Sequence, residues 1–350
     1  MANSQGKSGI LEMTEKTVVI NNMNPSDGST DVRPVAINDL PNCLICGNEL
    51  KPSVPFDNSF FCPACGFIYD PNTELKAGTV LMGKYRILNT LGAGGCGDIY
   101  ICHTLNDLKT RYVLKVLRDV TTPESQKRFE REAKLLKMLT CPVIVQFIDY
   151  WVAYSGSYII MEYVEGSTLT DIVKQYDIDE ESTLMIALEV AKALRFAWDL
   201  GKIVHRDIKP SNIMISKDQE VKLLDFGMAK QTNYDTNADI TANNAGLGTP
   251  KYMSPEQYKN AKEVDFKSDI YSLGVTMYFL LKKENPFTGN NFFEIYKDTI
   301  RNSPPPKEAF GGVCSNECAS LIQSMMELEP EKRPGSYDEL INAINAILKI

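Results

Sequence analysis

The stretch IVHRDIKPSNIMI, residues 203–215, decides the fold of this chain, because it places charged side chains between two apolar runs. It contains one of only two histidines in the sequence, followed by Asp207, Lys209 and Asn212. This spacing suits phosphoryl transfer: Asp207 can accept the proton of an attacking hydroxyl, and Lys209 can steady the γ-phosphate. Asn212 can hold a metal ion, so the stretch predicts a catalytic loop.

A second acidic position follows in LLDFGMAK, residues 223–230, where Asp225 stands at the end of a strand-like run. A carboxylate oxygen is the hard ligand that Mg²⁺ or Mn²⁺ prefers, and such an ion can bridge phosphate groups. We therefore expect Asp225, together with Asn212, to hold the metal ion.

A glycine loop precedes these segments in LGAGGCGDIY, with Gly92, Gly94 and Gly97 at positions that let backbone N–H groups approach phosphate oxygens. The alternative is a plain tight β-turn. A dinucleotide-binding loop requires a helix after the third glycine, whereas here a β-rich run, residues 98–102, follows. Strand, glycine loop and strand instead predict a flap over a nucleoside triphosphate.

The flap predicts a lysine on the next strand, and RYVLKVL supplies Lys115 between apolar neighbours. A lysine in such a run needs an anionic partner if it is buried. The segment 123–139 is predicted to be a helix and offers two glutamates. Glu132 is the preferred partner for the Lys115 ammonium, and Glu130 is the alternative.

From about Tyr85 to Ile350 the chain resembles the protein-kinase family, in its Ser/Thr branch. The resemblance rests on the glycine loop, Lys115, HRDIKPSN, Asp225-Phe226-Gly227, GTPKYMSPEQ, SDIYSLG and EKRPGS, which occur in the family's order. It implies an α+β, bilobal protein-kinase fold, with a β-rich N-lobe over residues 85–164 and a helical C-lobe over residues 165–350. Lys209-Pro210 and Thr249 of GTPKY are the features that favour Ser/Thr over Tyr kinases.

The resemblance also implies structural and regulatory roles. Glu256 is expected to form a buried ion pair with Arg333, and Asp269 is expected to brace the catalytic loop. Arg206 is expected to hold a phosphate on the activation segment, with Thr241 as the favoured phosphorylated residue. Thr249 is expected to be structural.

By the same resemblance, the stretch YIIMEYVEGSTL is the hinge that contacts the adenine ring of ATP. Met161 is the gatekeeper beside the adenine pocket. The backbone groups at the adenine edge belong to Glu162 and Val164, and the side chains that enclose the ring are those of Ile99, Val113 and Met214.

Four cysteines form two Cys-x-x-Cys pairs in the module over residues 41–72: Cys43, Cys46, Cys62 and Cys65. Two such pairs suit a tetrahedral structural Zn²⁺. The segment CGFIYDP is also similar to rubredoxin, so Fe is the less favoured metal, and disulfides are not expected in a cytosol. The resulting zinc-ribbon-like module either docks on the N-lobe and sets activity, or recruits a partner protein.

Residues 1–40 are predicted to be a flexible tail, with at most a docking strand over residues 17–20, and residues 73–84 to be a linker. The net charge of -8 and the absence of a basic stripe argue against nucleic-acid binding or an anionic membrane surface. The sequence shows neither a long apolar span nor a signal peptide, which favours a cytoplasmic location.

Together these features predict a protein serine/threonine kinase that moves the γ-phosphate of ATP to protein hydroxyls and phosphorylates its own activation segment. The alternative is a pseudokinase, an ATP-binding scaffold with a metal ribbon that recruits partners. Such scaffolds usually lack one of the lysine, the catalytic aspartate or the metal aspartate, whereas Lys115, Asp207 and Asp225 are all present.

Overall fold

The computed structural model describes the greater part of the chain. The described residues are 17–23, 30–36, 48, 51–54, 57–61, 68–69, 75, 77–94, 97–117, 129–130, 133–134, 136–153, 156–226, 250–259 and 264–350. Two compact units are distinguished, one made of residues 1–91, 100–111 and 152–156, and the other of residues 92–99, 112–151 and 157–350. The predicted domain boundaries are not tested by this division and stay predictions.

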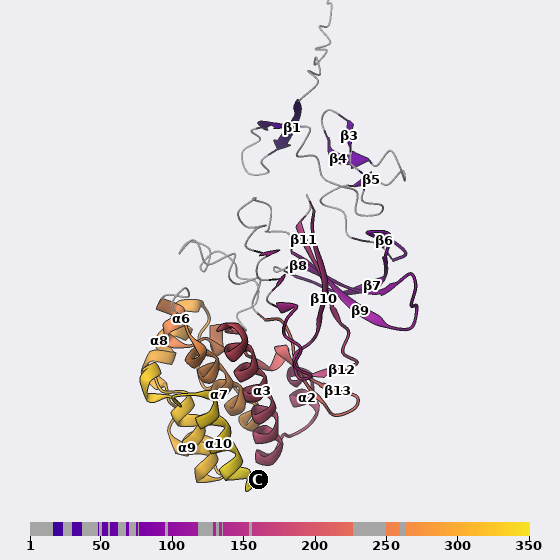
Figure 1. Cartoon of the computed structure of the whole chain (residues 1–350). Helices are drawn as coiled ribbons and strands as arrows, with labels where there is room; N and C mark the ends of the chain where they lie inside the picture. The colour runs from indigo at the N-terminus through magenta and orange to yellow at the C-terminus, as the bar shows by residue number, and fades with distance from the viewer. Residues whose placement is uncertain are drawn as a thin grey trace, which may run out of the picture. The chain divides into compact units, whose positions relative to one another are not determined.

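The N-terminal region contains two small antiparallel sheets (Figure 1). Strand β1 (Thr17–Met23) pairs with β2 (Thr30–Ala36) in a hairpin, which is longer than the single strand over residues 17–20 expected from the sequence. The second sheet has the order β3-β4-β5, with strands Lys51–Val54, Asp57–Phe61 and Ile68–Tyr69. This sheet lies within the predicted cysteine module.

The main sheet has six strands in the order β10-β11-β9-β8-β7-β6. Their bounds are Val80–Leu81 (β6), Tyr85–Gly94 (β7), Gly97–Thr104 (β8), Arg111–Leu117 (β9), Phe147–Ala153 (β10) and Gly156–Glu162 (β11). The predicted strands on both sides of the glycine loop and the predicted strand that carries Lys115 are confirmed here. Within the predicted linker, residues 73–84, strand β6 pairs with β7 and the Gly78 N–H donates to the Ile87 carbonyl at 2.8 Å.

A third sheet, of order β12-β13-β14, combines Gly166–Thr168, Ile213–Ser216 and Val221–Leu223. Gly166 permits its close pairing, since a Cβ there would lie 2.2 Å from the Ile215 carbonyl oxygen. Strand β13 begins directly after Asn212, and β14 ends two residues before Asp225. The pairing of Ile213 with Leu223 therefore brings the two predicted metal ligands to the same end of the hairpin.

Helices dominate the rest of the described chain. The α-helices are α2 (Leu169–Gln175), α3 (Glu180–Gly201), α6 (Pro255–Lys259), α7 (Phe266–Lys282), α8 (Phe292–Asn302), α9 (Asn316–Met325) and α10 (Tyr337–Leu348). Single 3₁₀ turns are η2 (Pro210–Asn212), η3 (Pro250–Tyr252), η4 (Lys307–Phe310) and η5 (Pro330–Lys332). Helix α3 packs against α7 and α10, and α7 packs against α9 (Figure 1).

Helices α3 and α7 form the centre of this core because of their apolar patterns. The Asp179 side chain accepts a hydrogen bond from the Ser182 N–H and starts α3, whose buried stripe includes Leu184, Ala187 and Ala191. Helix α7 is largely apolar and is buried along nearly its whole length. Among the described residues, no helix combines the length and the apolar content that a membrane crossing requires.

Candidate active site

The first feature of the site is an ion pair between two segments far apart in sequence. The Lys115 Nζ on β9 lies 2.8 Å from Oδ2 of Asp225, which follows β14. The Lys115 side chain is 12% exposed and that of Asp225 is 35% exposed. The pair supplies the anionic partner that a buried lysine requires, and it places the predicted phosphate-binding lysine beside the predicted metal ligand.

The register of β9 and β11 decides which side chains share a face with Lys115. Lys115 is opposite Ile159, and Val113 is opposite Met161. Opposite residues in an antiparallel pair point to the same side, as do residues two apart along one strand. The predicted gatekeeper, the predicted ring contact Val113 and the lysine therefore lie on one face of the sheet.

The glycine loop has the predicted strand–loop–strand organisation. Strand β7 ends at Gly94 and β8 begins at Gly97. Ile99 on β8 is half-buried, as are Val113 on β9 and Met214 on β13.

At the hinge, Glu162 is the last residue of β11 and Val164 is 9% exposed. The Glu162 N–H donates to the Gln146 carbonyl at 2.9 Å. Its carboxylate accepts hydrogen bonds from the Gln146 N–H and the Lys222 ammonium. The backbone N–H of Glu162 is therefore already used inside the protein, in its bond to Gln146.

The catalytic loop brings three predicted residues together. The Lys209 Nζ lies 3.0 Å from Oδ2 of Asp207. The Asn212 side-chain amide donates to the Asp207 carbonyl at 2.8 Å and to its Oδ2 at 3.1 Å. Because the amide nitrogen of Asn212 faces Asp207, its amide oxygen points elsewhere and is the atom suited to a metal. The Leu224 N–H bonds the Asn212 carbonyl at 2.8 Å and holds Asp225 nearby.

His205 connects this loop to the segment that carries Asp225, a role that no sequence motif indicates. Its Nε2 lies 2.7 Å from the Leu224 carbonyl, and its Nδ1 accepts from the Asp207 N–H at 3.3 Å. A single tautomer, protonated on Nε2, satisfies both contacts. The ring also packs at 4.7 Å against that of Phe226, and His205 is fully buried.

Asp269 on α7 lies beneath the loop, where the sequence analysis expects it. Its carboxylate accepts the His205 N–H at 2.7 Å and the Arg206 N–H at 2.8 Å. Arg206 has a φ of 66°, in the left-handed region, and these bonds hold that strained backbone. Burial raises the pKa of Asp269 to about 7, against the opposing effect of the two N–H donors and of the Arg206 charge.

Gln257 fixes the other side of Arg206, and no sequence motif marks it. Its side-chain nitrogen donates to the Arg206 carbonyl at 3.0 Å. Its oxygen accepts the Ser254 N–H at 3.0 Å and the Ser254 hydroxyl at 3.2 Å. The segment that begins α6 is thereby attached directly to the catalytic loop.

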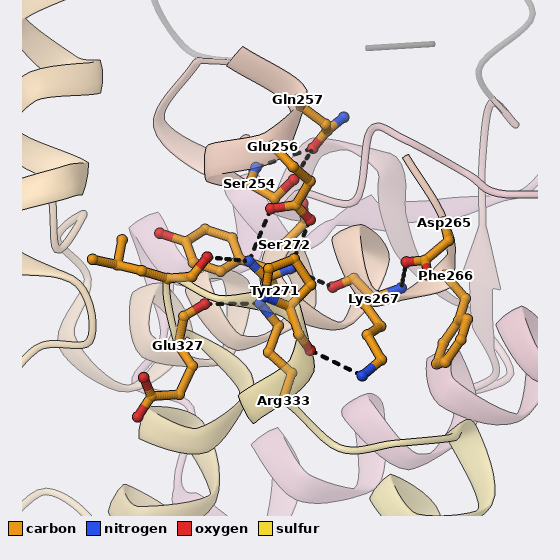
Figure 2. A network of polar contacts seen from close by, with 12 residues as sticks. Ser254, Glu256, Gln257, Asp265, Phe266, Lys267, Tyr271, Ser272, Glu327 and Arg333 are labelled. Atoms are coloured by element: carbon orange, nitrogen blue, oxygen red, sulfur yellow. Dashed lines mark hydrogen bonds and ion pairs between the residues drawn. The ribbon is translucent and has the colours of Figure 1, made fainter. Parts of the chain in front are cut away.

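Glu256 forms a two-point ion pair with Arg333, at 2.7 and 2.9 Å (Figure 2). The Arg333 side chain is 0% exposed and also donates to three carbonyls, those of Lys267, Glu327 and Leu328. Its guanidinium lies 4.8 Å above the Tyr271 ring. Every donor direction of this arginine is used, which offsets the cost of burying its charge.

Comparison with known proteins decides the family. The family model described as "Protein kinase domain" matches residues 85–344, which is more than half of the chain. The chain belongs to the protein kinase family. The predicted family is therefore confirmed, and the kinase motifs named from the sequence fall within the matched range.

Several curated kinases are similar to this one. The serine/threonine-protein kinase pkn2 of Myxococcus xanthus is 34% identical over 277 residues, which cover 76% of this chain and 33% of that protein. The serine/threonine-protein kinase PknB of Mycolicibacterium smegmatis is 35% identical over 260 residues, covering 72% and 41%. The chain thus spans less than half the length of these relatives.

Solved kinase structures agree on the fold. A mutant form of the PknI kinase domain of Mycobacterium tuberculosis superposes with a TM-score of 0.61 and 25% identity, covering 78% of this chain and 99% of that one. The α+β kinase fold, with its strands followed by a helical region, is confirmed by this likeness.

Seven predicted kinase-site and metal-site residues lie outside the described residues, so their roles stay predictions: Glu132, Thr241, Thr249, Cys43, Cys46, Cys62 and Cys65. Glu130, the alternative partner of Lys115, is exposed at its position in the chain.

Proposed function

We propose that this kinase transfers the γ-phosphate of ATP to Ser and Thr hydroxyls of protein substrates. The observation that carries the proposal is the cluster of Asp207, Lys209 and Asn212 beside the Lys115–Asp225 pair. These are the charged and polar groups that phosphoryl transfer requires, and a scaffold without catalysis has no need of all of them. The Ser/Thr kinases to which the chain is similar support the same substrate class.

Each side chain has a distinct task in this proposal. Asp207 accepts the proton of the attacking hydroxyl, and its hydrogen bond from Asn212 keeps the carboxylate oriented. Lys209, 3.0 Å from Asp207, stabilises negative charge on the transferred group. Lys115 binds the α- and β-phosphates, braced by Glu132.

Asn212 and Asp225 fit a hard divalent cation, because one offers an amide oxygen and the other a partly exposed carboxylate at the same end of the β13–β14 hairpin. Mg²⁺ or Mn²⁺ bound there supplies positive charge that neutralises the phosphate oxygens. The adenine ring is proposed to lie against Met161, Val113, Ile99 and Met214, with the hinge backbone of Glu162 and Val164 at its edge, under the flap formed by Gly92, Gly94 and Gly97.

Arg206 and Thr241 are proposed to form the regulatory switch of the activation segment. The Nε of Arg206 is buried and has no hydrogen-bond partner among the described residues. A buried donor without a partner costs about 1–3 kcal/mol, which a phosphate oxygen would recover. Phosphopeptide mass spectrometry of the active protein is expected to find the phosphate on Thr241. No phosphate on residues 232–241 would contradict the switch.

Residues 41–72 are proposed to bind one structural Zn²⁺ through Cys43, Cys46, Cys62 and Cys65. The antiparallel pairing of Phe61 with Ile68 supports this arrangement, because residues 62–67, which carry one cysteine pair, join the paired ends of β4 and β5. The ribbon or the N-terminal tail would contact a partner protein, or would act on the kinase itself. The cytoplasmic location expected from the sequence stays a prediction.

One assay tests the central proposal. The full chain is incubated with radiolabelled ATP, Mg²⁺ and a generic basic protein substrate, beside Asp207→Asn. Wild type is expected to label serine and threonine, and Asp207→Asn is expected to lose at least about 100-fold in rate. Equal labelling by both proteins would defeat the mechanism, and ATP binding without transfer by wild type would favour a scaffold. Atomic emission on the same preparation distinguishes zinc from iron.

A further inference from the structure

Lys222 connects the hinge to the strand that leads to Asp225, and no motif marks it. It lies on β14, three residues before Asp225, with a side chain only 12% exposed. Its Nζ lies 3.2 Å from Oε1 of Glu162 and donates to the Pro142 carbonyl at 2.9 Å. The Glu220 carboxylate, 65% exposed, is 3.7 Å away. The Lys222 ammonium thus interacts mainly with the Glu162 carboxylate at the hinge and with the Pro142 carbonyl.

Residues 142–146 are hydrogen-bonded to β14 on one side and to Glu162 of the hinge on the other. On one side the Val145 N–H donates to the Leu223 carbonyl at 3.0 Å, and the Leu223 N–H donates to the Val143 carbonyl at 2.6 Å. On the other side Gln146 and Glu162 exchange two hydrogen bonds, one through the Glu162 carboxylate. The Lys222–Glu162 ion pair adds a direct contact between β14 and the hinge to these hydrogen bonds.

The same lysine lies beside the floor of the predicted adenine slot. Met214 on β13 is directly opposite Lys222 on β14, so the two side chains share a face of that hairpin. Lys222 therefore adjoins two residues assigned to adenine: Met214 through the sheet pairing and Glu162 through the ion pair. Neither contact involves a phosphate-binding group.

We propose that Lys222 is a positioning residue for the adenine site, which fixes the hinge backbone and Met214 at the spacing that an adenine ring fills. The inference rests on the proposed function, because it presumes that ATP binds at this hinge. Loss of the ammonium frees the Glu162 carboxylate and the Pro142 carbonyl to move, so the hinge occupies several positions and binding must select one.

The test compares two lysines that join neighbouring segments. Lys222→Met keeps the length and apolar stem but removes the charge. Lys217→Met is the matched control, because Lys217 pairs with Glu165 just beyond the hinge at 3.0 Å, with both side chains more than 60% exposed. Titration calorimetry gives Kd for ATP and for adenosine, and steady-state assays give kcat at saturating ATP.

Lys222→Met is expected to raise the Kd values of ATP and of adenosine by the same factor, about 5- to 10-fold. Its kcat should stay within about two-fold of wild type. Lys217→Met is expected to leave both Kd values unchanged. Glu162→Gln, which preserves shape, should reproduce the Lys222→Met effect, and the double variant should be no weaker than either single one. Thermal unfolding of each variant checks that the fold is kept.

Two results would overturn the inference: unchanged Kd values for ATP and adenosine in Lys222→Met, or weaker binding of ATP with unchanged binding of adenosine. If the Kd values were unchanged and kcat were raised, the pair would be a restraint on turnover. Weaker binding of ATP alone would place the effect on the phosphate side. Failure of wild type to bind ATP would defeat the proposed function itself, which separates that outcome from these two.

Discussion

The Lys115 Nζ and the Asp225 Oδ2 lie 2.8 Å apart, although 110 residues separate them in the chain. The lysine is on the second strand after the glycine loop, and the aspartate follows the β13–β14 hairpin. A pair that is only partly exposed is screened less by salt than an ion pair on the surface. The pair therefore joins the strand-derived and hairpin-derived parts of the active site in one contact.

Lys115→Met is expected to lower the rate of phosphoryl transfer by about 100-fold or more, because a preorganised positive charge is lost at the phosphates. Methionine fills the same space in a side chain that is 12% exposed, so the melting temperature should stay close to that of wild type. Lys192→Met on α3, which removes an exposed pair with Glu189, is the control and should keep full activity. Transfer by Lys115→Met at the wild-type rate would remove Lys115 from the mechanism.

Asp269 predicts a defined pH dependence of stability. Its ordinary pKa of 3.8 is raised to about 7 in the folded state by burial, so folding favours the protonated form. Its stabilising contribution is therefore full below pH 3.8 and is lost as the pH rises through 7. The loss is on the order of 4 kcal/mol, measured as the free energy of unfolding of wild type minus that of Asp269→Asn.

Asp179→Asn provides the control for this measurement. Hydrogen bonds from Ser182 lower the pKa of Asp179, so its contribution is present above pH 3.8 and is lost only at lower pH. Between pH 4 and 7 the free energy of unfolding of wild type minus that of Asp179→Asn should stay constant, while the same difference for Asp269→Asn falls. Parallel curves for the two variants would mean that Asp269 keeps an ordinary pKa in the folded protein.

The active-site residues that could be predicted are those that carry a local motif. Asp207, Asn212 and Asp225 stand in short polar segments beside strands, and the structure brings them to one end of a hairpin. Gln257 and Lys222 could not be predicted, because a glutamine after Glu256 and a lysine in a strand resemble ordinary surface residues. Their partners, the Arg206 carbonyl and the Glu162 carboxylate, are 51 and 60 residues away, and only the fold brings them close.

Secondary structure is likewise predictable only where a local sequence pattern marks it. The apolar pattern of α7 extends over several turns, so a helix there can be predicted from the sequence. Strand β6 falls within the predicted linker because Val80 and Leu81 form only two residues of strand, and its hydrogen bonds come from β7. Strand β2 contains Asp31 and Pro34, which are depleted in strands, so the sequence there predicts a tail and not a hairpin with β1.

Arg333→Met is expected to destabilise the fold by about 3–5 kcal/mol, because it leaves the Glu256 carboxylate without its partner. Three backbone carbonyls also lose their donor. Arg195→Met removes an exposed pair with Asp338 and should cost at most about 1 kcal/mol. Urea unfolding measures both variants, and equal midpoints would show that the buried pair contributes no more than the surface one.

Gly274 is expected to be required where α7 approaches α9. A Cβ at this position would lie 2.9 Å from the Met325 Cβ and 2.9 Å from the Met326 Cγ, so the helices must separate. Alanine favours a helix over glycine by about 1 kcal/mol, yet overpacking a core typically costs about 1–3 kcal/mol. We expect Gly274→Ala to lower the free energy of unfolding by about 1–2 kcal/mol, because the Met325 contact is close to backbone.

Gly201→Ala is the control for Gly274→Ala, since it adds the same methyl group to the end of another helix. Its nearest neighbour is the Ile203 Cγ1 at 3.6 Å, an ordinary van der Waals distance. Helix propensity should therefore dominate, and this variant should be as stable as wild type or more stable by about 0.5 kcal/mol. Urea titrations at one temperature compare the two. If Gly274→Ala were as stable as Gly201→Ala, the α7–α9 interface would have room for a methyl group, and close helix packing would not explain the glycine.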